Sequence, residues 1–173
     1  MIPGSESSLK GRERSNEERT FPKFLIETDI LAEFLIAGPS IEGGRAVPPE
    51  EPSLLRRALG VSVCYTTMLN VMELFRATAS DPERNAIAAL LRLVRVLGFH
   101  ARYARPFAEY ARTFDDLATD RETMILGMAK ISDLTVLTKF HFDRYRHLGI
   151  VNVWNVIPAP VELHSAPVER RTR

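Results

Sequence analysis

The feature that most constrains the fold is a junction near residue 27, where one hydrophobic periodicity gives way to another. Residues 24–26 (Phe-Leu-Ile) form an unbroken apolar run, which is typical of a strand buried on both faces. From residue 30 onward the apolar positions are spaced as on one face of a helix. Thr28 and Asp29 stand between the two patterns. An acid at such a junction lies at the edge where open α/β sheets bind their ligands.

Strand and helix signals alternate along the rest of the chain. The expected strands are 61–65, 96–100, 134–138 and 150–156, and the expected helices are 30–37, 53–59, 68–78, 81–96, 103–117, 119–131 and 141–147. Gly60 is expected to end its helix, and residues 38–49, rich in glycine and proline, are expected to form a loop. This alternation predicts an α/β fold with a central parallel sheet and helices on both faces.

Composition favours a single soluble domain. The chain has 173 residues, 45% of them hydrophobic, with 23 Lys and Arg against 22 Asp and Glu. No apolar stretch is long enough to span a membrane. The single cysteine, Cys64, cannot form an internal disulfide, so we expect a cytoplasmic protein.

Three acids are candidates for a common site. Asp29 lies at the first strand-to-helix junction, Glu73 lies within a helix, and Glu122 begins a later helix. Each also has a structural alternative: Thr28 or Asp29 as a helix cap, Glu73 as partner of Arg76, and Glu122 as the second half of a Thr-x-x-Glu capping box. If the three converge, their repulsion calls for a hard cation such as Mg²⁺ or Mn²⁺.

The sequence resembles the PIN-domain ribonucleases, especially the toxin subunits of VapBC-type toxin–antitoxin pairs. Residues 24–31 (FLIETDIL) resemble the family's opening strand and its Asp-Thr-Asn or Asp-Thr-Asp signature, and residues 65–74 (YTTMLNVMEL) resemble its second motif. Residues 122–138 resemble the third motif with the strand after it, and 141–142 (His-Phe) the pair that ends the pattern. The resemblance covers roughly residues 23–156 and implies a PIN-like fold.

The resemblance also implies which acids hold the metal. Either Glu27 or Asp29 is the first ligand, Glu73 is the second, and Glu122 stands where the family has Asp. The family often has a fourth Asp or Asn where this chain has Phe140.

Three further residues are candidates for supporting roles. Asp143 could serve as the fourth ligand if the loop is shortened, and Asn70 shares a helix face with Glu73. Thr138, at the end of a strand, could bind a metal-bound water or simply bond to the backbone.

The function implied by the resemblance is that of an Mg²⁺- or Mn²⁺-dependent endoribonuclease. Such a toxin would form a homodimer and would be restrained by an antitoxin that blocks its acidic pocket. An alternative is a degenerate PIN domain that binds RNA or a protein without cutting RNA. A phospho-acceptor receiver domain is disfavoured, because residues 65–70 offer no acceptor Asp.

We predict that two flexible tails, residues 1–22 and 158–173, flank a folded domain of residues 23–157. Both tails are poor in apolar side chains and rich in charge or proline. Limited proteolysis should therefore trim the tails and leave a stable fragment. Loss of the cooperative melting transition on deletion of residues 1–20 would contradict this prediction.

Overall fold

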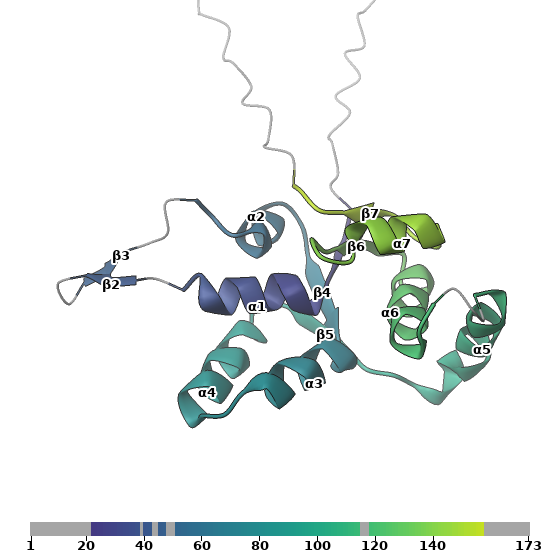
Figure 1. Cartoon of the computed structure of the whole chain (residues 1–173), viewed down its shortest axis with the longest axis horizontal. Coiled ribbons are helices and arrows are strands. Elements are labelled where there is room, and N and C mark those ends of the chain that lie inside the picture. Colours follow the sequence, from purple (N-terminus) through teal and green to yellow (C-terminus); the bar gives the residue numbers. More distant parts are fainter. Residues whose placement is uncertain (1–21, 39, 43–44, 48–50, 115–117, 158–173) are drawn as a thin grey trace, which may run out of the picture.

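The computed structural model describes residues 22–38, 40–42, 45–47, 51–114 and 118–157. Apart from Pro22, the two predicted tails lie outside these residues, and so do residues 115–117 of the predicted helix 103–117. The described elements form an α/β fold built on a central parallel sheet, as predicted (Figure 1).

The central sheet has five parallel strands in the order β5-β4-β1-β6-β7. The strands are β1 (Phe24–Ile26), β4 (Cys64–Thr67), β5 (Arg95–Leu97), β6 (Thr135–Leu137) and β7 (Val153–Trp154). The apolar run at 24–26 forms β1 in the middle, where all three residues are fully buried. A continuous apolar run therefore marks the central strand, because helices cover both of its faces.

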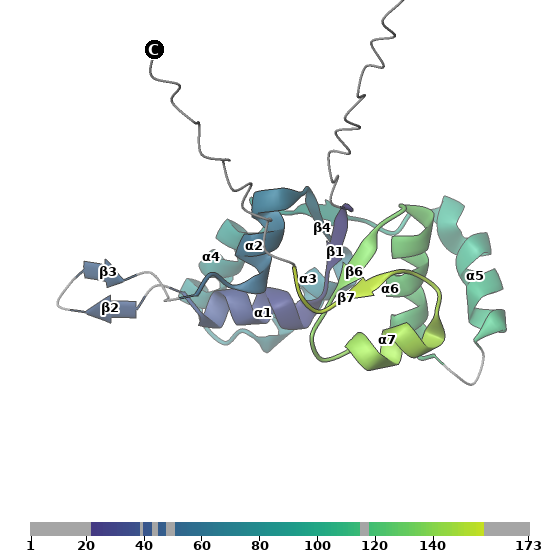
Figure 2. The same cartoon turned by 90° about the horizontal axis from the view of Figure 1, so that it is seen from above.

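The helices divide between the two faces of the sheet (Figure 2). They are α1 (Thr28–Ile36), α2 (Leu54–Val61), α3 (Met68–Ala77), α4 (Asp81–Leu90), the 3₁₀ turn η1 (Ala101–Tyr103), α5 (Ala104–Thr113), α6 (Asp120–Ile131) and α7 (Phe142–Leu148). Within the described ranges, no helix is long and apolar enough to cross a membrane.

Two hydrophobic cores lie on opposite faces of the sheet. One core joins Phe24 and Ile26 to residues of α1, α2, α3 and α4, whereas the other joins Leu25 to residues of α6 and α7. Side chains of α5, among them Phe107, pack against the second core. Adjacent residues of β1 thus face different cores, because successive side chains of a strand point to opposite faces.

Several predicted boundaries were wrong. Gly60 does not end its helix: α2 continues to Val61, and β4 begins only at Cys64. Residues 40–47, predicted as loop, contain a short antiparallel hairpin of β2 (Ser40–Glu42) and β3 (Arg45–Val47), which extends away from the domain in both views.

The helix predicted over 81–96 ends at Leu90, and the last predicted strand shrinks to β7. Val96 instead pairs with Thr66 of β4, so backbone pairing at the sheet edge prevails over helical periodicity there. Likewise, the helix predicted from residue 103 is a 3₁₀ turn followed by α5.

Two helical glycines should respond oppositely to alanine. No atom of the described residues lies within 4 Å of a Cβ placed on exposed Gly60, so Gly60→Ala should stabilise the fold by about 0.5–1 kcal/mol through helix propensity. A Cβ on buried Gly127 would lie 2.7 Å from the ring of Phe107, which also packs against Phe99 and Tyr103. Because overpacking costs about 1–3 kcal/mol, Gly127→Ala should destabilise the fold. Urea denaturation measures the free energy of unfolding of both variants. Equal changes in the two variants would contradict the α5–α6 packing described above.

Candidate functional site

The candidate site is a cleft of about 510 Å³ at the carboxyl ends of the parallel strands. It is lined by Thr28, Asp29, Ala32, Glu73, Thr119, Arg121, Glu122, Phe140 and His141. The chain leaves β1 for α1 on one face of the sheet and leaves β6 for α7 on the other. The cleft thus lies where the connections that follow two neighbouring strands turn to opposite faces of the sheet, the usual ligand position in open α/β sheets.

Glu27 begins the site by capping α1. Its carboxylate accepts a hydrogen bond from the backbone N–H of Thr28 at 3.0 Å, so Glu27, rather than Thr28 or Asp29, is the N-cap. The residue is completely buried. A buried carboxylate requires a compensating partner, because transfer of an isolated charge out of water is very unfavourable.

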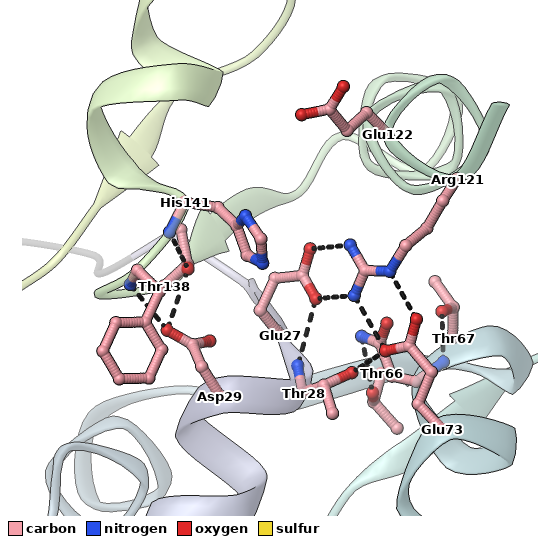
Figure 3. Close-up of polar contacts among 12 residues, drawn as sticks. Glu27, Thr28, Asp29, Thr66, Thr67, Glu73, Arg121, Glu122, Thr138 and His141 are labelled. Atoms are coloured by element: carbon pink, nitrogen blue, oxygen red, sulfur yellow. Dashed lines mark hydrogen bonds and ion pairs between the residues drawn. The ribbon is translucent and has the colours of Figure 1, made fainter. Parts of the chain in front are cut away.

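Arg121, the second residue of α6, supplies the compensating charge (Figure 3). Its guanidinium contacts Glu27 through Nη1 at 3.2 Å and Nη2 at 2.9 Å. The same guanidinium contacts Glu73 through Nη2 at 2.8 Å and through Nε. Arg121 therefore forms a two-pronged ion pair with each of two acids that are 46 residues apart in the chain.

Neighbouring hydroxyl groups complete this network. Tyr145 accepts a hydrogen bond from Nη1 of Arg121 at 3.0 Å and donates one to Glu27, while Thr28 donates one to Glu73. Arg121 thus makes five contacts, matching the five N–H donors of a guanidinium. A buried polar network of this kind is stabilising only when its members are satisfied, and here the arginine is.

The proton affinities follow the same network. The hydrogen bonds from Arg121 hold the pKa of Glu73 below its ordinary value, and those to Glu73 raise the pKa of Arg121. Burial, together with the nearby Glu27 carboxylate, raises the pKa of Tyr145. These three shifts keep Glu73 ionised, Arg121 charged and Tyr145 protonated over the physiological range.

Asp29 faces a different part of the cleft. Its Oδ2 accepts three hydrogen bonds, from Thr138 Oγ1 at 3.0 Å and from the backbone N–H groups of Lys139 at 2.7 Å and Phe140 at 2.9 Å. Asp29 thereby holds the turn after β6 against the start of α1. Its other oxygen, Oδ1, is buried and has no hydrogen-bond partner among the described residues.

Glu122 is held by a capping box within its own helix and by an ion pair with α7. It forms the predicted capping box with Thr119, and it pairs with Arg144 of α7 at 2.9 and 3.1 Å. The hydrogen bond from Arg144 lowers the pKa of Glu122 to about 2. In Figure 3 its carboxylate lies apart from those of Glu27 and Glu73.

The residues predicted to support the site have separate roles. Asn70 is fully buried, and its amide donates to the backbone carbonyl of Ile26 at 2.9 Å, which fixes α3 against the end of β1. Thr138 is buried against Asp29, whereas Asp143 is exposed on α7 and does not line the cleft. Phe140 lies at the cleft with 85% of its surface exposed.

The arrangement does not fit a divalent metal. Asp29, Glu73 and Glu122 line one cleft, but among the described residues no three His, Cys, Asp or Glu side chains are grouped to hold an ion. Both oxygens of Glu27 and both of Glu73 contact Arg121. The predicted partner of Glu73, Arg76, is replaced by this arginine from a distant helix.

Sequence reasoning missed Arg121 and Tyr145. Both lie in segments that were correctly predicted as helical, but no local pattern indicates which arginine reaches across the sheet. The one available signal was Glu27, since an acid directly after a fully buried strand requires a nearby cation.

The ion pair of Glu122 should make stability depend on pH. Because the pKa of Glu122 in the folded state, about 2, is below the ordinary 4.5, this acid stabilises the fold above pH 4.5. Its contribution is lost as the pH falls toward 2. Since Gln preserves the capping box and Arg144 is about half exposed, Glu122→Gln should cost only about 1 kcal/mol at pH 7. Urea unfolding should show that the free energy of unfolding of the wild type exceeds that of Glu122→Gln by less and less as the pH is lowered from 7 to 3. A difference that stays constant over this range would contradict the ion pair.

Comparison with known proteins places the fold. No protein-family model matches the chain, and no curated protein matches it in sequence. The structure is similar to VapBC2 from Rickettsia felis bound to a promoter DNA fragment (TM-score 0.58, 10% identity, 76% of this chain and 97% of that chain). It is also similar to VapBC-1 from nontypeable Haemophilus influenzae (TM-score 0.57, 12% identity) and to FitAcB from Neisseria gonorrhoeae (TM-score 0.51, 22% identity). Each of these two matches covers 76% of this chain and 96% of the other chain. At these identities the likeness concerns the fold, which is PIN-like as predicted.

Proposed function

We propose that this protein is a PIN-fold subunit of the toxin–antitoxin type that acts by binding a protein partner and does not cut RNA. The observation that supports this most directly is the guanidinium of Arg121 between Glu27 and Glu73. A metal-dependent nuclease requires carboxylate oxygens that are free to hold a cation. The four oxygens of Glu27 and Glu73 are all occupied by contacts with Arg121.

The remaining positions of the motif point in the same direction. Glu122, which stands where the family has Asp, is paired with Arg144. Phe140, which stands where the family often has a further acid or amide, offers no ligand atom in its side chain. Asp29 uses one of its two oxygens to hold the turn after β6. At these positions the acids thus already bind other groups of the protein, and the fourth position carries no acid.

A protein partner is supported by the surface of α3. Met68, Met72 and Phe75 lie along one side of this helix and are 44, 52 and 39% exposed. Apolar side chains gathered in this way are typical of protein–protein contacts. The solved structures of similar fold are toxin–antitoxin complexes, so an antitoxin-like chain is the partner that we propose. A second copy of this chain, forming a homodimer, would be visible by light scattering of the purified protein.

A metal-dependent endoribonuclease is the second candidate, and Asp29 is the observation that favours it. Its Oδ1 is buried and finds no partner in the part of the chain that the structure describes, and such an oxygen is a natural position for a cation. Glu73 and Glu122 line the same cleft. This function needs Mg²⁺ or Mn²⁺ and also needs Arg121 to leave the two glutamates.

Metal binding separates the two candidates. We expect calorimetric titration of Mn²⁺ into the wild type, Asp29→Asn and Glu122→Gln to show equal, negligible binding, because Arg121 already occupies the acid pair. RNA incubated with Mg²⁺ should remain intact. Binding of Mn²⁺ by the wild type that is lost in Asp29→Asn, accompanied by RNA cleavage, would instead establish the nuclease. If the protein binds RNA without cleaving it, RNA rather than a protein is the partner, and the proposed protein partner is contradicted.

A further inference from the structure

We propose that Arg121 is a built-in counter-cation that takes the place of a divalent metal and keeps such a metal out of the acidic cleft. The inference rests on the proposed function, in which the wild type binds no metal. It goes further by assigning the exclusion of metal to one side chain.

The contacts of Arg121 are those that a shared cation would make. All four carboxylate oxygens of Glu27 and Glu73 contact its guanidinium, at distances of 2.8 to 3.2 Å for three of them. A metal ion would need the same oxygens. Arg121 and a metal ion therefore compete for one position, and only one of them can occupy it.

The charge balance shows why a cation is needed there. Two carboxylates meet a single guanidinium, and Glu27 has no contact with solvent. Without Arg121 the buried Glu27 and the nearby Glu73 would repel each other, and only the hydrogen bonds from Thr28 and Tyr145 would offset their charge. A divalent ion would remove this repulsion completely, so the acid pair should accept one once the arginine is gone.

Arg121 is positioned by the fold. Its backbone lies in the first turn of α6, which the capping box of Thr119 and Glu122 fixes. Its guanidinium is also held by the hydroxyl of Tyr145, a fully buried residue of α7. The side chain is thus held at both ends, and the arrangement is specific rather than a chance contact of a long surface residue.

Replacement of Arg121 tests the inference. We expect Arg121→Gln to bind Mn²⁺ about tenfold or more tightly than the wild type by calorimetry, since no ion pair has to be broken first. Mn²⁺ should also raise the melting temperature of this variant and not that of the wild type. Arg105→Gln is the matched control: it removes the same charge from an exposed pair with Glu109 and should leave metal binding unchanged. Glu27→Gln/Arg121→Gln removes one acid as well and should lose the gain.

Every outcome bears on the inference. If Arg121→Gln folds only when Mn²⁺ is present, the metal has replaced the arginine and the inference is supported. If it does not fold at all, Arg121→Lys carries the test, since its single ammonium group cannot bind both carboxylates as a fork. Folded variants with no more response to Mn²⁺ than Arg105→Gln would overturn the inference. Tight Mn²⁺ binding by the wild type would refute the proposed function and, with it, this inference, whereas the preceding outcome overturns the inference alone.

Discussion

The ion pair between Glu27 and Arg121 is the interaction on which the site depends. Glu27 directly follows the central strand and caps the next helix, so the fold places a carboxylate at a position that water does not reach. Such a group is tolerated only with a charged, hydrogen-bonded partner. Arg121 reaches it from the other side of the sheet, which makes α6 and α7 part of the same network as α1.

The pairing of Glu27 with Arg121 also determines the partners of the other acids in the cleft. Glu73 shares the guanidinium, and its pKa is lowered for that reason. Glu122, the neighbour of Arg121 in sequence, faces away and pairs with Arg144. The acids that sequence reasoning grouped into a single site therefore line one cleft but have separate partners. An acidic cleft that contains its own arginine leaves fewer carboxylate oxygens free for a metal ion than a cleft lined by acids alone.

The likeness to VapBC structures concerns the fold, and the chemistry must be judged from this chain's own residues. A PIN-like sheet brings the ends of β1, β4 and β6 together whatever side chains follow them. In this chain the polar side chains after β1 and β6 are engaged in hydrogen bonds within the protein. Glu27 accepts a hydrogen bond from the backbone of Thr28, the hydroxyl of Thr28 donates to Glu73, and that of Thr138 donates to Asp29. The same scaffold can thus present a metal site or a closed ionic network, and single residues decide between them.

The sequence by itself determined the class of fold and the place of the site. The buried run at 24–26, the switch to helical spacing at residue 30 and the alternation that follows are local patterns, so they predict a parallel sheet and an acidic edge. Only the tertiary structure decided which cation meets which acid. Arg121 and Glu27 are far apart in the chain, and their pairing depends on how α6 crosses the sheet. Local periodicity carries no record of such a contact, because any of the chain's arginines could satisfy a buried carboxylate that it reached.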